Sequence, residues 1–431
     1  MNNSRYTQSQ ILLERAERVI PLGSQTFSKS NMQYPQGETP LFLDKGRGGR
    51  VWDVDDNEYV DLVCGLLPVL LGYCDPDVDA AIRMQMENGI SFSLATKLEV
   101  ELAERLVEMI PCAEMVRYGK NGTDATSAAV RLARAFTGSD HILAGGYHGW
   151  QDWYIGATTR SKGVPEAVRK LTHKVPFNDL DAVRNHLEYY SEDVAAMIME
   201  PMNIMEPFPG YLEELKELLQ SHGALLIFDE VITGFRYAPG GAQELFGVTP
   251  DLASFGKAMG NGMPISAVVG RAEIMHEMKE IFFSSTFGGE ALSLAAAIAV
   301  VDKIKREPVI DRLWSTGQKL ANGVQEQLSR FELDEYISLA GKAPWMLLQF
   351  KDHPNADKDV LKTLLLREMI GNDVLLNGSH NVCFAHNDTD VAIVVNAYKE
   401  ALSVIAEEVK IVGVEDRLDI PIIRPVFSVR G

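Results

Sequence analysis

Residues 224–228 consist of Ala-Leu-Leu-Ile-Phe, an uninterrupted apolar run that stops at the acidic pair Asp229-Glu230. A run of this kind is typical of a strand buried on both faces within a parallel sheet. Parallel sheets belong to α/β folds, and their ligands bind outside the carboxyl ends of the strands. The sequence therefore predicts an α/β fold and places Asp229 at its ligand-binding edge.

Lys257 follows Asp229 by 28 positions (257 − 229), at the end of the segment Ser254-Phe255-Gly256-Lys257. A lysine amine can form a Schiff base with an aldehyde, and a carboxylate can keep a pyridine nitrogen protonated. Together the two residues suit pyridoxal 5'-phosphate, with Lys257 and Asp229 as the catalytic pair. Two plainer interpretations stay open, because a lone strand-end aspartate often caps a helix and a lone lysine is usually a solvated surface residue.

Composition narrows the class of protein. The chain has 431 residues, a net charge of −19 and a pI near 5.0, so we expect two lobes and neither a nucleic acid nor an anionic membrane as partner. The cysteines are scattered without metal-ligand spacing, which predicts no metal site and a reducing compartment. They are Cys64, Cys74, Cys112 and Cys383. With no apolar signal core and no run of about 18 apolar residues, we expect a cytoplasmic enzyme.

The spacing of apolar residues predicts the main elements. Helices are expected over 8–20, 76–88, 97–110, 125–136, 211–222, 290–304, 310–330 and 388–408. Alternation around Asp55-Asp56-Asn57 predicts a β-hairpin over 51–62. Further strands are expected at 114–118, 141–144, 195–199, 266–270, 345–350 and 374–376, and the tail 420–431 is β-like in composition.

Three turns rich in glycine or hydroxyl groups are candidate ligand sites. Two of them, 119–124 and 283–289, precede predicted helices, and a helix N-terminus offers N–H groups and a positive dipole end to a phosphate. Thr123 and Thr286 supply hydroxyls there, although each turn is also explained by an ordinary cap, with Thr123 capping its own helix. The third turn, Gly145-Gly146, leads to Tyr147, whose ring can stack on a pyridine ring or pack in the core.

The central motif resembles the class III aminotransferases of the fold-type-I pyridoxal phosphate enzymes. The matching residues are Leu226-Ile-Phe-Asp-Glu-Val-Ile-Thr-Gly-Phe-Arg236, Thr249-Pro-Asp-Leu252 and Gly256-Lys257. The resemblance runs from about residue 16 to at least residue 401, and the glutamate-1-semialdehyde aminomutase branch is the nearest. It implies a large domain at 56–309 with a mostly parallel seven-stranded sheet. It also implies a small α+β domain at 310–431, with residues 1–55 contributing to the small domain and the active site.

The resemblance also implies a set of cofactor contacts. Gly122 and Thr123 bind the phosphate, with Asn121 in the place of the family's serine. Tyr147, followed by His148, stacks on the cofactor ring. The remaining contacts implied are Val231 beneath the ring, Glu200 near the ring hydroxyl, and Thr286 on the phosphate held by the other subunit. The contact by Thr286 implies a homodimer with composite active sites.

Substrate residues are carried over at three positions. Lys29 stands where the family has an arginine for the substrate carboxylate, and lysine keeps the charge but lacks the bidentate fork. Trp150 and Trp153 differ from the residues of the usual relatives, and we expect them to shape the substrate pocket. No metal is implied.

These observations predict a two-step transamination. Lys257 would move the proton, glutamate would be the amino donor, and an aldehyde or ketone of sugar-like character would be the acceptor. The first alternative is a 2,1-aminomutase, although residues 377–386 lack the glutamate that the mutase branch carries there. The second is a non-catalytic α/β ligand-binding protein, which is weakened because no Gly-x-Gly-x-x-Gly follows the first strand.

Overall fold

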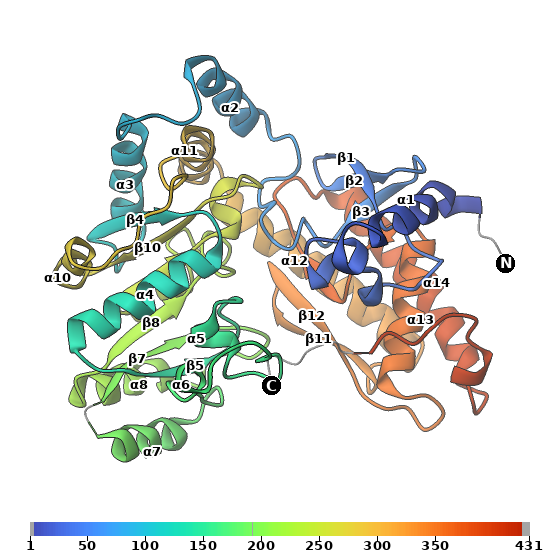
Figure 1. Cartoon of the computed structure of the whole chain (residues 1–431). Coiled ribbons are helices and arrows are strands. Elements are labelled where there is room, and N and C mark those ends of the chain that lie inside the picture. Colours follow the sequence, from blue (N-terminus) through green and yellow to red (C-terminus); the bar gives the residue numbers. More distant parts are fainter. Residues whose placement is uncertain (1–3, 192, 425–431) are drawn as a thin grey trace. The chain divides into compact units, whose positions relative to one another are not determined.

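The computed structural model describes residues 4–191 and 193–424, which divide into two compact units (Figure 1). We call the one formed by residues 67–69 and 76–310 the large unit. The small unit is formed by residues 4–66, 70–75 and 311–424. Each is described by itself below.

A seven-stranded sheet forms the centre of the large unit. Its strands follow the order β4-β10-β9-β8-β7-β5-β6; β5 to β9 run parallel, and β10 is antiparallel to both of its neighbours. This confirms the expected α/β fold with a mostly parallel sheet. The strands are β4 (Met115–Gly119), β5 (His141–Gly145), β6 (Thr172–Lys174), β7 (Val194–Met199), β8 (Leu225–Asp229), β9 (Leu252–Phe255) and β10 (Ser266–Gly270).

Helices surround this sheet, and α4 packs most directly on it. The buried face of α4 is rich in alanine, including Ala125, Ala129 and Ala133, and it contacts the apolar side chains of Ile198 and Ile227 from β7 and β8. Small side chains let the helix approach the strands closely. The helices are α2 (Pro76–Asn88), α3 (Lys97–Met109), α4 (Gly122–Thr137), α5 (Asp152–Ile155), α6 (Glu166–Arg169), α7 (Leu180–Tyr190), α8 (Tyr211–Ser221), α9 (Ala242–Phe246), α10 (Ala272–Met275) and α11 (Ala291–Arg306), with 3₁₀ turns at Lys257–Gly260 and His276–Lys279.

The small unit contains two sheets. One has the order β1-β2-β3-β13, with β13 parallel to β3, and the other has the antiparallel order β11-β12-β14. Its strands are β1 (Leu43–Arg47), β2 (Arg50–Asp53), β3 (Glu58–Asp61), β11 (Ile337–Lys342), β12 (Trp345–Phe350), β13 (Val374–Leu375) and β14 (Ser379–Asn381). Its helices are α1 (Thr7–Glu17), α12 (Val309–Arg330), α13 (Lys358–Gly371) and α14 (Asp388–Glu408), with short 3₁₀ turns at Ser4–Tyr6, Pro21–Gly23, Phe27–Lys29, Asn31–Gln33 and Glu415–Arg417.

Asp53 fixes the turn of the β2–β3 hairpin. Its Oδ1 accepts hydrogen bonds from the backbone N–H groups of Asp55 and Asn57, at 2.9 and 2.8 Å. Its Oδ2 accepts from the Asn57 side-chain amide and the Tyr59 hydroxyl, both at 2.9 Å. The predicted hairpin is confirmed, and a single buried carboxylate with four donors holds its loop.

Most predicted elements are confirmed, including α2 and α14 at their expected bounds. The helix expected from residue 290 begins at Ala291, because the Glu290 carboxylate acts as its N-cap and accepts from the N–H groups of Leu292 and Ser293. Residues 420–424 form no strand, and the rest of the β-like tail lies outside the described residues. Within the described part of the chain, no helix has both the length and the apolar character needed to cross a bilayer.

Candidate active site

Asp229 ends β8, in the middle of the large unit's sheet. Its side chain is buried, and each carboxylate oxygen accepts one hydrogen bond. Oδ2 accepts from Nδ1 of His148 at 2.8 Å, and Oδ1 accepts from the backbone N–H of Val231 at 3.1 Å. A carboxylate can accept about four hydrogen bonds, so Asp229 keeps acceptor capacity for a ligand.

His148 orients Asp229. Because Nδ1–H donates to the carboxylate, Nε2 is left as an acceptor, and this buried atom has no partner among the described residues. The loop that carries His148 is held from both sides. The Thr126 hydroxyl donates to the His148 carbonyl at 2.9 Å, and the Tyr154 hydroxyl donates to the Gly146 carbonyl at 2.6 Å. These bonds, together with the Asp229 carboxylate, fix the position of the imidazole.

The N-terminus of α4 lies where a phosphate site was expected, and its cap differs from the alternative considered for Thr123. Asn121 is the N-cap, and the Asp124 carboxylate accepts from the N–H groups of Lys120 and Asn121 at 2.9 and 2.8 Å. Thr123 therefore does not cap its own helix. Its hydroxyl oxygen is buried and has no partner among the described residues, which leaves it available to an anion at the helix N-terminus.

Close backbone approaches show that four segments converge here. A Cβ added at Gly122 would lie 2.8 Å from Cγ1 of Val231, and one added at Gly149 (φ +105°) would lie 2.4 Å from Oγ1 of Thr123. One added at Gly256 would lie 3.4 Å from the same Val231 atom and 3.7 Å from Cα of Gly122. The start of α4, the loop after β5, the end of β8 and the turn after β9 therefore meet at one place.

Lys257 follows Gly256 directly and begins a 3₁₀ turn with a left-handed backbone (φ +34°). The preceding strand, β9, is in register with the Asp229 strand, since Asp229 pairs with Ser254 and the Glu230 N–H donates to the Ser254 carbonyl at 2.9 Å. A non-glycine residue in this region of φ is strained, and such strain is concentrated at functional sites. The lysine is thus presented by the turn next to the converging segments.

Of the acidic pair, only Asp229 is available to a ligand. The Glu230 side chain is fully buried and accepts from the Thr233 hydroxyl and from the backbone N–H groups of Ala242 and Gln243, at 2.7 and 2.8 Å. Burial raises the pKa of Glu230. This carboxyl group holds the start of α9.

Glu200 and Tyr147 lie at the next strand end. Glu200 follows β7, and its Oε2 accepts from the Tyr147 N–H at 3.2 Å. The half-buried Tyr147 ring makes an edge contact with Tyr154, with ring centroids 5.8 Å apart. Glu200 therefore supports the loop that carries Tyr147.

The predicted substrate residues occupy different environments. Trp153 is buried, its indole N–H donates to the Ser127 hydroxyl at 2.9 Å, and its ring stacks near His148. Trp150 is 65 % exposed and so can contact a ligand. Lys29 is exposed on the small unit, and Thr286 is exposed on the large unit.

Two hydroxyl groups belong to this region but were not predicted from the sequence. Ser254 and Ser266 lie in β9 and β10, and their buried hydroxyl oxygens have no partner among the described residues. A Cβ at Gly256 would lie 3.8 Å from Cβ of Ser266. The available signal was one serine in each of two otherwise apolar strands, which is also ordinary strand composition.

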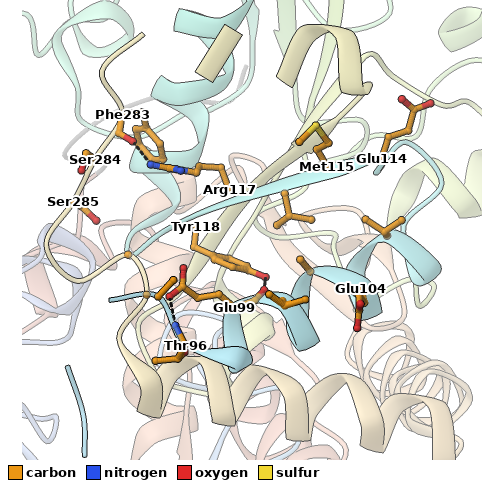
Figure 2. A pocket seen from close by; sticks show the side chains of 17 residues that line it. Thr96, Glu99, Glu104, Glu114, Met115, Arg117, Tyr118, Phe283, Ser284 and Ser285 are labelled. Carbon is orange, nitrogen blue, oxygen red and sulfur yellow. Dashed lines mark hydrogen bonds between the residues drawn. The ribbon is translucent and has the colours of Figure 1, made fainter. Parts of the chain in front are cut away.

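A cavity of about 600 Å³ lies elsewhere in the large unit, between α3, β4 and the 283–289 turn (Figure 2). Arg117 donates to the Phe283 carbonyl at 3.1 Å on one side of it, and the Tyr118 hydroxyl donates to the Glu99 carbonyl at 2.9 Å on the other. Ser284 and Ser285, which precede Thr286, also line the cavity. The turn that carries Thr286 thus borders an open, partly apolar hollow.

Comparison with known proteins gives a consistent result. The family model for class-III aminotransferases matches residues 32–365. The chain is 37 % identical over 410 residues to 3-aminobutyryl-CoA aminotransferase of Cloacimonas acidaminovorans (strain Evry), covering 93 % of this chain and 97 % of the relative. It is 41 % identical over 337 residues to glutamate-1-semialdehyde 2,1-aminomutase of Syntrophobacter fumaroxidans (strain DSM 10017 / MPOB), covering 74 % and 77 %.

Solved structures agree with the sequence comparison. The FumI protein of Sphingopyxis sp. MTA144, in its PLP internal aldimine form, superposes with a TM-score of 0.88 at 30 % identity, covering 95 % of this chain and 99 % of that one. An omega-transaminase from Sphaerobacter thermophilus gives a TM-score of 0.82 at 28 % identity, covering 92 % and 97 %. The chain belongs to the class-III aminotransferase family, whose cofactor is pyridoxal phosphate.

Proposed function

We propose that this enzyme transfers an amino group from an amino acid donor, with glutamate as the first candidate, to an aldehyde or ketone acceptor. The observation that carries the proposal is the buried Asp229 carboxylate, which is held by His148 and keeps free acceptor capacity. It lies on the strand whose end meets the α4 N-terminus and the turn before Lys257. An acid in this position suits a pyridinium nitrogen, and the lysine suits an aldehyde.

The residues present fit the family's cofactor. The buried Thr123 hydroxyl without a partner lies at a helix N-terminus, where a phosphate is favoured. Gly122, Thr123 and Asn121 would hold the phosphate, Asp229 the ring nitrogen, and Val231 and Tyr147 the ring faces. His148 would act through Asp229, and Glu200 through the loop of Tyr147. When bound, pyridoxal phosphate supplies an electron sink for the bonds at the substrate's amine-bearing carbon.

The chain's own residues then handle protons and charge. The Lys257 amine removes the proton from the amine-bearing carbon of the donor, and later returns a proton to the carbon of the acceptor. The Asp229 carboxylate keeps its orientation because the His148 N–H donates to it. The exposed Trp150 and the exposed Lys29 are the proposed contacts for the substrate.

The role of Lys257 is tested by borohydride reduction of the cofactor-loaded enzyme, followed by peptide mass spectrometry. We expect a pyridoxyl adduct on Lys257. The Lys257→Ala variant should lose the adduct and all amino transfer, and the control Lys170→Ala, at an exposed lysine, should retain both. An adduct on another lysine would refute the assignment.

A second candidate function is an internal 2,1-amino shift. It is favoured by relatives described as glutamate-1-semialdehyde 2,1-aminomutases, at up to 41 % identity. A screen with glutamate as donor separates the two functions. The acceptor panel should contain a sugar-like aldehyde, a sugar-like ketone and 3-oxobutyryl-CoA, the last suggested by the 3-aminobutyryl-CoA relative. Isomerisation of glutamate semialdehyde, with no nitrogen exchange to any external acceptor, would favour the mutase.

We also propose that the enzyme is a homodimer with composite active sites, in which Thr286 of each copy reaches the other copy's phosphate. The supporting observation is a set of exposed apolar side chains on α2, on α3 and the segment before it, on β4 and on the turn of Thr286, three of which (Val100, Val107 and Met115) line the 600 Å³ cavity. Single exposed apolar residues are ordinary, but many on neighbouring elements suit an interaction surface. The group consists of Met84, Met86, Ile90, Phe92, Leu94, Val100, Val107, Met115, Phe282 and Phe287.

Sedimentation equilibrium tests the dimer. The wild type should have the mass of two 47.7 kDa chains. Phe282→Asp should give monomers with weakened cofactor binding, because a charge would be buried at the interface. Val412→Asp, at an exposed apolar site on the small unit, is the matched control. A wild type that is monomeric and fully active would refute composite sites.

We further propose a cytoplasmic location. All four cysteines are thiols, which suits a reducing compartment. Fractionation of cells that express a tagged chain tests this, and recovery of the activity outside the cytoplasmic fraction would refute it.

A further inference from the structure

A cluster of two cysteines and one histidine lies in the small unit, apart from the residues described above. Cys64 follows β3, and Cys383 and His386 follow β14. The two sulfur atoms and one ring nitrogen all lie within 4.8 Å of one another, and all three side chains are buried. The transamination proposed above uses none of them. Such a cluster could hold a metal ion, or it could be a dithiol.

Hydrogen bonds in the cluster argue against a metal ion. Cys64 Sγ lies 3.3 and 3.1 Å from the carbonyl oxygens of Asp61 and Asn381, which are the acceptors for its single S–H. Carbonyl oxygens favour a protonated thiol, whereas a metal ligand must be a thiolate. Both ring nitrogens of His386 also have backbone partners. Nδ1 accepts from the Cys383 N–H at 3.1 Å, and Nε2 lies 3.3 Å from the Gly49 carbonyl oxygen.

The proximity of the two sulfur atoms, within 4.8 Å of each other, suits an S–S bond between them. Contacts with Cys64, first, and with His386 hold the pKa of Cys383 well below its usual range. The thiolate is the nucleophilic form of cysteine. Cys383 is therefore the attacking sulfur, with a second thiol beside it. Cys74 and Cys112 are not part of the cluster.

We propose that Cys64 and Cys383 are a redox-active pair that closes to a disulfide when the enzyme meets a hydroperoxide. Cys383 attacks one oxygen of hydrogen peroxide, the O–O bond breaks, and the sulfur becomes a sulfenic acid as hydroxide leaves. Cys64 then attacks that sulfur, and the sulfenic oxygen leaves as water. Two thiols lose two electrons, one peroxide becomes two waters, and one S–S bond forms.

The disulfide would act on a strained segment that leads into the large unit. Cys64, Gly65, Leu66 and Leu67 all have left-handed backbones, with φ of 47°, 65°, 77° and 80°. Such a run is rare and is maintained only by its surroundings. The Leu67 carbonyl accepts at 3.1 Å from the guanidinium of Arg236, a fully buried residue of the 226–236 motif. Oxidation would therefore tether the start of a segment whose other end contacts the active-site motif.

The test is disulfide mapping on the cofactor-loaded enzyme. Protein treated with hydrogen peroxide is alkylated, digested without reductant and analysed by mass spectrometry. We expect one peptide pair that joins Cys64 to Cys383, which disappears after dithiothreitol treatment. We also expect the melting temperature to rise by about 5 °C on oxidation, because the cross-link closes a long loop in the unfolded chain.

Variants and metal analysis complete the test. Cys64→Ser and Cys383→Ser should each lose the peptide pair and the melting shift, and the exposed control Cys74→Ser should keep both. If a serine variant does not fold, the wild-type peptide map still decides. Alkylated thiols or sulfonic acids at both positions after peroxide treatment would overturn the proposal. So would one tightly bound zinc ion per chain in the purified enzyme.

Discussion

Asp53 and Asp229 are both buried aspartates at the last position of a strand, yet the protein uses them differently. Asp53, in the small unit, accepts four hydrogen bonds, all from the hairpin that it closes. Asp229, in the large unit, accepts two, one of them from His148. A carboxylate with four donors is saturated, whereas one with two can still bind a cationic ring nitrogen. The two aspartates are alike in burial and position, so the number of hydrogen-bond donors separates the structural Asp53 from Asp229, the proposed catalytic residue.

Replacing Asp229 gives the largest expected effect. Asp229→Asn keeps the shape of the side chain but removes the charge that would hold a protonated ring nitrogen. We expect kcat to fall by about 10³-fold, as when one preorganised electrostatic contact is lost, with the melting temperature nearly unchanged. Steady-state kinetics and thermal denaturation measure the two quantities. A normal kcat for Asp229→Asn would show that Asp229, like Asp53, has no catalytic role.

Replacing Asp53 should lower the stability of the fold and leave kcat unchanged. Asp53→Ala leaves the Asp55 and Asn57 N–H groups and the buried Tyr59 hydroxyl without their acceptor. We expect the free energy of unfolding to fall by about 3 kcal/mol, with kcat per folded molecule retained. Urea denaturation and active-site titration test this. Asp56→Ala in the same loop is the control, and an equal loss there would show that the loop rather than the carboxylate matters.

The third prediction extends the comparison to buried histidines. Burial lowers the pKa of His380, in the small unit, to about 3, and its Nε2 lies 2.7 Å from the Tyr398 hydroxyl. The native state therefore keeps His380 neutral, whereas the unfolded chain binds a proton below about pH 6.5. The free energy of unfolding therefore decreases as the pH falls from about 6.5 towards 3. At pH 5 the loss is about 2 kcal/mol. His380→Gln should remove this part of the pH dependence in urea denaturation, and His276→Gln, at an exposed histidine, should not.

The smallest effect is expected at Thr123. Thr123→Val keeps the side-chain volume but removes the buried hydroxyl that has no partner among the described residues. We expect cofactor affinity to fall by about 10-fold, which corresponds to one hydrogen bond, with unchanged unfolding free energy. Fluorescence titration with pyridoxal phosphate measures the cofactor affinity. The control Thr137→Val removes a hydroxyl at the far end of α4 and should leave affinity unchanged, so equal losses would contradict a phosphate role.

The sequence predicted features that depend on neighbouring residues. The strand ending at Asp229, the β2–β3 hairpin and α14 each follow from local patterns of apolar and turn residues, and each is confirmed. The pairing between distant segments could not be predicted from local patterns. β10 is antiparallel between β4 and β9, with Ser266 opposite Gly119, and no local pattern encodes that register. The Cys64–Cys383 cluster joins residues 319 positions apart (383 − 64) and was missed for the same reason.

The roles of individual side chains within a correctly located turn could not be predicted from the sequence either. The turn at 119–124 was placed correctly, but the cap is formed by Asn121 and Asp124, because the backbone at Asn121 has the extended geometry that a cap requires. Trp153 was expected to shape the substrate pocket, and the structure shows a buried ring whose indole N–H donates to the half-buried Ser127. Both outcomes depend on backbone angles and neighbours that residue type does not specify.

The contact between Gly149 and Thr123 has a practical consequence for enzyme engineering. A methyl group at Gly149 would collide with the Thr123 hydroxyl, whereas the adjacent Trp150 is largely exposed. Two consecutive positions therefore differ in how far they tolerate mutation. Libraries that seek a new acceptor should randomise position 150 and leave position 149 as glycine, so that selection acts on substrate choice without eroding cofactor retention.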